Sequence, residues 1–124
     1  MSKKSKTIIC IEANAINRYM IKKLLESEGY NVHGAETKEV GLGLVESVAP
    51  DLILIDLHMP GVDGYAITQH IRAISGLEHV PIIALTTHVG VDGYRKTPIS
   101  GCDGAIQKPI DAQLFVNNVG RFFV

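Results

Sequence analysis

The sequence feature that most constrains the fold is a short apolar run, residues 52–55, that ends in the single carboxylate of Asp56. Apolar runs of this length, when closed by turn residues, are typical of strands buried on both faces in a parallel sheet. Residues 59–64, MPGVDG, then turn the chain sharply. Because open α/β sheets bind ligands at the carboxyl ends of their strands, Asp56 is a candidate site residue. The alternative role for this carboxylate is to cap a loop or a helix.

The same alternation of strand and helix signals recurs along the chain. We expect strands over residues 7–11, 30–35, 52–56, 82–86 and 105–107. Asn14, Thr37 and Asp111 are expected to cap helices, a third helix is expected to end at Gly76, and a short helix is expected within residues 91–100. Apolar residues recur at helical spacing in these segments: Ile16, Met20, Leu24 and Leu25; Val40, Leu44, Val45 and Val48; Ile67, Ile71 and Ile74; Leu114, Phe115, Val119 and Phe122.

Five alternations of strand and helix predict a doubly wound α/β fold, in which helices cover both faces of a five-stranded parallel sheet. The strand order 2-1-3-4-5 is the common arrangement at this size. In that order the carboxyl ends of the first and third strands meet at the switch point. Four polar residues then lie together at strand ends: Glu12, Asp56, Thr86 and Lys108.

Composition limits the classes of function that remain. The 124 residues, 46% hydrophobic and 20% charged, suffice for one domain with a single core. A net charge of −1 provides no field for nucleic acid or membranes, and no apolar run is long enough to span a bilayer. Cys10 and Cys102 belong to no ligand motif, so we expect buried, unreactive thiols. We expect a cytoplasmic protein with residues 1–6 as a flexible tail.

Two carboxylates, a hydroxyl and an ammonium in one cleft suit phosphoryl transfer. Facing carboxylates need a cation or a shared proton, and Mg²⁺ commonly binds one or two carboxylates together with phosphate oxygens. Lys108 and Thr86 can then bind a phosphoryl group while Asp56 acts as the nucleophile. The sequence contains no GxxxxGK[ST], GxGxxG or GxSxG motif, which argues against a P-loop NTPase, a dinucleotide site or a serine hydrolase. We therefore expect phosphoryl-transfer chemistry at this site, in a protein that is not an enzyme.

Three stretches in register resemble the receiver domain of two-component response regulators. They are DLILIDLHMPGVDG over residues 51–64, ALT over residues 84–86 and QKP over residues 107–109. The resemblance covers nearly the whole chain and implies the flavodoxin-like, CheY-like fold, whose strand order is 2-1-3-4-5. The segment NAINR, residues 14–18, is similar to receivers of hybrid histidine kinases and phosphorelays. We expect a single receiver domain over residues 1–124.

The resemblance also implies a role for each polar residue at the strand ends. Asp56 is expected to take a phosphoryl group from a phosphohistidine on a histidine kinase or a histidine phosphotransfer protein. Glu12, Asp56 and the main-chain carbonyl of His58 are expected to bind Mg²⁺. Thr86 and Lys108 are expected to contact the phosphoryl group. A downstream protein partner is expected on the face made by helix 4, strand 5 and helix 5.

Two positions depart from the pattern of the family. The second acidic position, which usually binds Mg²⁺ directly, is Ala13 here, so metal binding is expected to be weakened. The position that usually carries Tyr or Phe as a rotamer switch is Ala105, so the usual two-state device is missing or replaced.

These departures leave alternatives open. The chain could be a degenerate receiver that binds its partner regardless of phosphorylation, and a small flavin carrier is a further alternative, which predicts a yellow protein. His58 and His88, with Glu12 and Asp56, could form a transition-metal site, although exposed loop histidines are the simpler interpretation.

Overall fold

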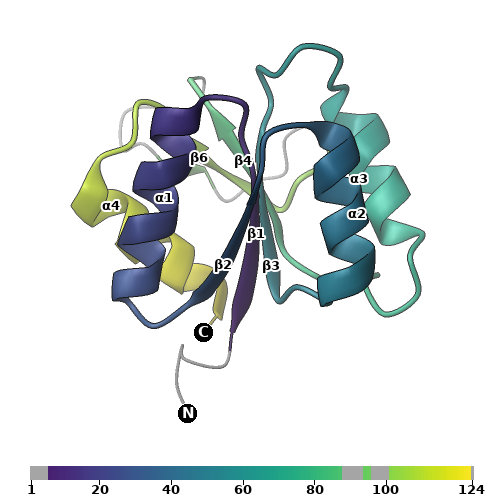
Figure 1. Cartoon of the computed structure of the whole chain (residues 1–124), viewed down its shortest axis with the longest axis horizontal. Helices are drawn as coiled ribbons and strands as arrows, with labels where there is room; N and C mark the ends of the chain where they lie inside the picture. The colour runs from purple at the N-terminus through teal and green to yellow at the C-terminus, as the bar shows by residue number, and fades with distance from the viewer. Residues whose placement is uncertain (1–5, 88–93, 96–100, 124) are drawn as a thin grey trace.

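The computed structural model describes residues 6–87, the backbone of residues 94–95, and residues 101–123. A central sheet separates two layers of helices, with α1 and α4 against one face and α2 and α3 against the other (Figure 1). The first and last described residues of the chain lie close together, with Lys6 Nζ 5.8 Å from the centroid of the Phe123 ring. Residues 1–5, most of the predicted tail, lie outside the described residues.

Five parallel strands form the sheet in the predicted order. They are β1 (Thr7–Ile11), β2 (Asn31–Ala35), β3 (Leu52–Asp56), β4 (Ile82–Thr86) and β6 (Gly104–Gln107). The full order is β2-β1-β3-β4-β6-β5, so β6 is the predicted fifth strand and β5 (Tyr94–Arg95) lies antiparallel at the edge. The helix predicted within residues 91–100 is therefore wrong at residues 94–95, and its remaining positions lie outside the described residues. An open sheet edge offers unpaired main-chain groups, which here pair with this segment.

In the described part of the chain, four α-helices lie in the connections, each with a polar residue at its N-cap. They are α1 (Ala15–Ser27), α2 (Lys38–Val48), α3 (Gly64–Arg72) and α4 (Ala112–Gly120), with a 3₁₀ turn, η2 (Arg121–Phe123), after α4. The predicted caps Asn14, Thr37 and Asp111 are confirmed, because each side chain accepts a main-chain N–H of the first turn. No helix in the described part of the chain is long and apolar enough to cross a membrane.

The third helix ends earlier than predicted, at Arg72 rather than near Gly76. The Arg72 guanidinium donates hydrogen bonds to the main-chain carbonyls of Leu77 and Val80, and these bonds hold the connection to β4 in a turn. The apolar spacing through Ile74 continues into this turn, so periodicity alone could not place the end of the helix.

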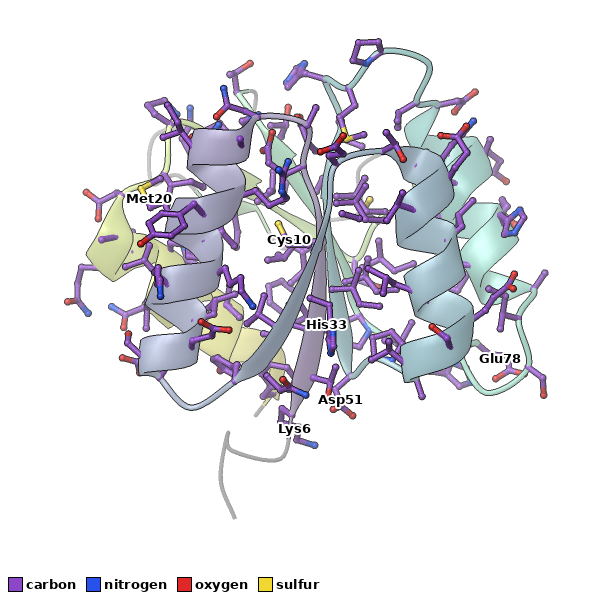
Figure 2. The ribbon with its side chains drawn as sticks, viewed as in Figure 1. Lys6, Cys10, Met20, His33, Asp51 and Glu78 are labelled. Carbon is purple, nitrogen blue, oxygen red and sulfur yellow. The ribbon has the colours of Figure 1, made fainter. Side chains whose placement is uncertain are left out.

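Alternation along the strands divides the core into two clusters. In β1, Ile9 and Ile11 face α2 and α3, whereas Ile8 and Cys10 face α1 and α4. Figure 2 labels Cys10 in the middle of the molecule. Cys10 and Cys102 are both free and buried, which confirms the predicted burial, and burial raises the pKa of each thiol to about 12.

Most of the apolar positions identified by the helical spacing face the core, but one in each of α1, α2 and α4 is exposed. Ile16, Val40 and Leu114 are exposed, and Ile21 is buried in α1 instead. In α2 the reason is a close approach to β1 at Gly41, where an added Cβ would lie 2.5 Å from Ile11 Cδ1. A position without a side chain carries the contact, and hydrophobic periodicity cannot detect it.

Candidate functional site

The four polar residues predicted at strand ends lie on one rim of the sheet. Glu12 follows β1, Asp56 ends β3, Thr86 ends β4 and Lys108 follows β6. Because β1, β3, β4 and β6 are adjacent and parallel, their carboxyl ends share one edge. The residues Glu12, Asp56 and Thr86 are only 1%, 4% and 2% exposed, so the rim holds two carboxylates and a hydroxyl away from solvent.

Lys108 brings the two carboxylates into a single charged cluster. Its Nζ lies 3.3 Å from Glu12 Oε1 and 3.2 Å from Asp56 Oδ2. The Lys108 main-chain N–H donates to the Thr86 carbonyl at 2.9 Å, which fixes the start of the β6–α4 loop beside β4. The ammonium therefore neutralises part of the negative charge that two buried carboxylates would otherwise concentrate here.

The two oxygens of the Glu12 carboxylate differ in their hydrogen bonding. Oε2 accepts the Asn14 main-chain N–H at 2.9 Å. Oε1 is buried, faces the Lys108 ammonium and accepts no hydrogen bond from the described residues. Burial raises the pKa of Glu12 above its usual value, and the nearby Asp56 carboxylate adds to this effect. The Asn14 N–H and the Lys108 ammonium act in the opposite direction.

Asp56 is held by the chain that follows it. Its Oδ1 accepts the His58 main-chain N–H at 2.9 Å, and its Oδ2 faces Lys108. The Leu57 N–H pairs with the Leu85 carbonyl at 3.1 Å, which extends the β3–β4 pairing beyond Asp56. One carboxylate oxygen is thereby fixed by main chain, and the other points toward the cation of the cluster.

The donor set is compatible with a hard cation such as Mg²⁺. Glu12 and Asp56 offer carboxylate oxygens, and the unbonded Glu12 Oε1 has lone pairs to spare. The main-chain carbonyl of His58 would be the third protein ligand. Mg²⁺ usually retains several waters, so this set fits the ion. Among the described residues no cluster of three His, Cys, Asp or Glu side chains could hold a metal, and His88 lies outside them.

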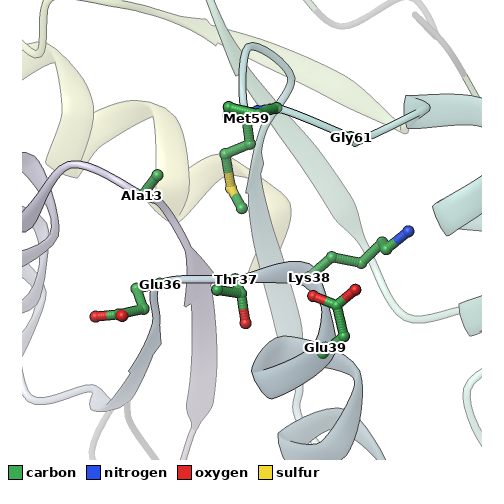
Figure 3. A pocket seen from close by; sticks show the side chains of 8 residues that line it. Ala13, Glu36, Thr37, Lys38, Glu39, Met59 and Gly61 are labelled. Carbon is green, nitrogen blue, oxygen red and sulfur yellow. The ribbon is translucent and has the colours of Figure 1, made fainter.

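Ala13 opens the site on the side where the family pattern places an acid. A pocket of about 330 Å³ lies there, between the β1–α1, β2–α2 and β3–α3 loops. In Figure 3 the short Ala13 side chain and the Met59 thioether lie across the pocket from the segment that carries Thr37 and Lys38. An acidic side chain at position 13 would enter this space, so the substitution leaves room for water.

Two side chains at the site have roles that the sequence interpretation missed. Arg18 Nη1 donates to the carbonyl of Glu12 at 2.8 Å and to that of Ala13 at 3.3 Å, so it anchors the loop that carries Glu12. His58 Nε2 lies 3.1 Å from Thr86 Oγ1, although only its main-chain carbonyl and a transition-metal role had been considered. The position of His58, two residues after Asp56 and at the rim that also carries Thr86, could have indicated this contact.

Ala105 lies in β6 opposite Ala84 of β4, and it is fully buried. Its methyl group packs in the core cluster that faces α2 and α3. A methyl group has no alternative rotamer, so this position cannot respond to a movement of the Thr86 hydroxyl by rotating a ring.

Comparison with known proteins decides the family. The response regulator receiver domain family model matches residues 8–119. The chain belongs to this family. The receiver is 29% identical over 118 residues to the polar-differentiation response regulator DivK of Brucella ovis, covering 95% of this chain and 96% of that protein. It is a receiver domain of two-component signalling.

Solved structures agree with this assignment. The receiver domain of the sensor histidine kinase PA1611 from Pseudomonas aeruginosa is 28% identical with a TM-score of 0.77, covering 94% of this chain and 95% of that one. That protein was solved with a magnesium ion coordinated in its active site cleft. The chemotaxis response regulator CheY4 of Vibrio cholerae, 23% identical, shares the fold with a TM-score of 0.82 and covers 94% of this chain and 97% of that one.

Proposed function

We propose that this receiver accepts a phosphoryl group on Asp56 from a phosphohistidine of a histidine kinase or a phosphotransfer protein. The observation that carries the proposal is the shared ammonium, with Lys108 Nζ within 3.3 Å of both Asp56 Oδ2 and Glu12 Oε1. A cation in this position can stabilise negative charge on the carboxylate before transfer and on the incoming phosphoryl oxygens during transfer. The modified protein then signals through protein contacts in the cytoplasm.

In the transfer step an Asp56 carboxylate oxygen attacks phosphorus. The new O–P bond forms as the P–N bond to the donor imidazole breaks, and the departing nitrogen keeps the electron pair. Asp56 Oδ1 stays bonded to the His58 N–H, which leaves Oδ2 as the attacking oxygen. Mg²⁺, held by Glu12, Asp56 and the His58 carbonyl, would neutralise phosphoryl charge. The chain is an acceptor consumed once per transfer, not an enzyme.

A degenerate receiver is the second candidate function, and Ala105 is the observation that favours it. With a buried methyl group at this position, phosphorylation cannot be transmitted by an aromatic ring in β6. In that case a partner would bind the face near β6 and α4 equally well whether or not Asp56 is modified.

The test is incubation with Mg²⁺ and acetyl phosphate, read by intact mass. We expect the mass of one phosphoryl group to be added to the wild type and to Asp111→Asn, in which asparagine is an equally good N-cap. We expect no addition to Asp56→Asn. A wild-type protein that gains no mass under any Mg²⁺ concentration would contradict the phosphoacceptor role and favour the degenerate receiver.

A further inference from the structure

The His58 imidazole joins the end of β4 to the loop that follows Asp56. The main chain of His58 donates to Asp56 Oδ1 at 2.9 Å. Its ring Nε2 lies 3.1 Å from Thr86 Oγ1 and 3.4 Å from the Thr87 main-chain nitrogen. One exposed residue therefore contacts both the proposed phosphoacceptor and the hydroxyl at the end of the neighbouring strand.

The contacts of Nε2 define the direction of these hydrogen bonds. The Thr87 main-chain N–H can only donate, so Nε2 is an acceptor in this arrangement. A neutral imidazole has one acceptor nitrogen, which places the ring hydrogen on Nδ1. The Thr86 hydroxyl must then donate its hydrogen to Nε2. In the unmodified protein that hydrogen is directed to His58 and away from Asp56.

A phosphoryl group on Asp56 would compete for the same hydrogen. A hydroxyl has a single hydrogen, and a phosphoryl oxygen can only accept a hydrogen bond. The Thr86 hydroxyl can therefore donate to His58 or to the phosphoryl group, but not to both. Position 105, fully buried and occupied by alanine, supplies no ring to take part in this exchange.

We propose that His58 is the positioning residue for Thr86 and the element that moves when Asp56 is modified. Its imidazole holds the hydroxyl in the unmodified protein and is released when the hydroxyl turns to the phosphoryl group. The inference rests on the proposed phosphorylation of Asp56. The released ring changes the exposed surface between β3 and α3, which gives the receiver a two-state element that does not require an aromatic residue at position 105.

The direct test follows the histidine rings by NMR in uniformly ¹⁵N-labelled wild-type protein. Beryllofluoride with Mg²⁺ serves as the probe of the modified state, and the His58 signals are assigned by their absence in His58→Gln. We expect the Nε2 signal of His58 to move on addition of beryllofluoride, because its bond from Thr86 is lost. The His33 and His70 signals should not move, since neither residue lies at this rim.

A variant series measures the competition at equilibrium. His58→Phe keeps a ring but removes the acceptor, so the hydrogen bond from the Thr86 hydroxyl to the side chain at position 58 is absent before beryllofluoride binds. We expect the half-saturating beryllofluoride concentration to fall about threefold to tenfold, the range for one hydrogen bond. His58→Gln, which places an amide oxygen near the position of Nε2, should restore a value near that of the wild type. His70→Phe, on the exposed face of α3, is the matched control.

The outcomes separate this inference from the function on which it rests. If beryllofluoride and acetyl phosphate modify the protein but the His58 signals stay fixed, the inference is overturned and the phosphoacceptor role stands. An unchanged or higher half-saturating concentration in a folded His58→Phe has the same meaning. If neither reagent acts on the wild type, the proposed function fails, and the inference fails with it.

Discussion

The aspartates at the two ends of the sheet have different partners. At the amino end, Asp51 Oδ2 accepts the Thr7 N–H at 2.7 Å, and Asp103 Oδ2 accepts the Ile82 N–H at 2.8 Å. Figure 2 labels Asp51 at this end of the molecule, close to Lys6. At the carboxyl end, Asp56 shares a single ammonium with a second carboxylate, that of Glu12. Asp51 and Asp103 accept hydrogen bonds from the starts of neighbouring strands. Glu12 and Asp56 instead place two negative charges beside one cation.

The comparison shows what separates a structural carboxylate from a reactive one in the same fold. A carboxylate that accepts a main-chain N–H of a neighbouring strand, as Asp51 and Asp103 do, joins the two strands. A carboxylate that faces another carboxylate across one cation keeps an oxygen available, at some cost in stability. The residue type is the same at both ends, and the partners decide the role.

The largest expected effect comes from removing the shared cation. In Lys108→Ala, Glu12 and Asp56 would face each other without a counter-charge, and no ammonium would remain for the phosphoryl oxygens. We expect the rate of phosphorylation by acetyl phosphate to fall about 100-fold, as for loss of one electrostatic donor at a reacting centre. The fold should persist, because Glu12 can take up a proton. Rates from intact mass check this, with the exposed Lys23→Ala as control.

The next largest effect concerns Ala13, which occupies the position at the carboxyl end of the sheet where the family pattern has a second acidic residue. Ala13→Asp should raise Mg²⁺ affinity at least tenfold, because even an indirect partner of a metal ligand is worth about 10–100-fold. The measurement is a Mg²⁺ titration followed by NMR or fluorescence. Ala66→Asp adds the same charge to the exposed first turn of α3 and should leave the titration unchanged. Equal affinities in Ala13→Asp and wild type would contradict the assignment of Ala13 as the weak point.

The sequence was sufficient for the strand order and for the placement of four polar residues on one rim of the sheet. Strand ends such as Asp56 and Lys108 could be aligned because parallel strands present their carboxyl ends on one edge. The His58–Thr86 hydrogen bond could not be predicted, because it depends on where a loop side chain points after a turn. Periodicity places residues on faces but carries no information on the rotamers of loop residues.

The errors in the fold have an equally local cause. Ile16 fits the helical spacing of α1 and yet is 78% exposed, because the contact with the sheet is made by Ile21 and Leu25. Residues 94–95 became an edge strand because β6 offered free main-chain groups, a tertiary effect that local propensity does not include. Packing decided the element boundaries and the exposure of single positions such as Ile16, and the sequence pattern decided the rest.

A matched pair of substitutions tests the comparison between the two ends directly. Asp103→Asn weakens the charge-assisted bonds from Ile82 N–H and Arg72, so we expect a loss of about 1 kcal/mol in the free energy of unfolding. Asp56→Asn keeps an oxygen for the His58 N–H and removes one of two crowded charges, so we expect no loss or a small gain. Urea denaturation of both variants measures the difference. A loss of equal size in both would show that Asp56 is a structural residue like Asp103.

The smallest effect is a pH dependence that originates from Glu12. Its pKa in the folded protein is raised above the usual 4.5 by burial first and by Asp56 second, so the folded state binds this proton more tightly than the unfolded state. The free energy of unfolding therefore falls as pH rises from about 4.5 through the raised pKa, and it recovers on acidification.

Glu12→Gln isolates this contribution, because other groups are common to both proteins. Glu26, whose pKa is lowered by its hydrogen bond from Lys22, acts in the opposite direction but cancels in the difference. We expect the stability of the wild type relative to Glu12→Gln, measured by urea denaturation, to increase as pH is lowered from neutral toward about 4.5. A difference independent of pH would mean that Glu12 is as well satisfied as Asp51, and the two ends of the sheet would no longer differ in the way described.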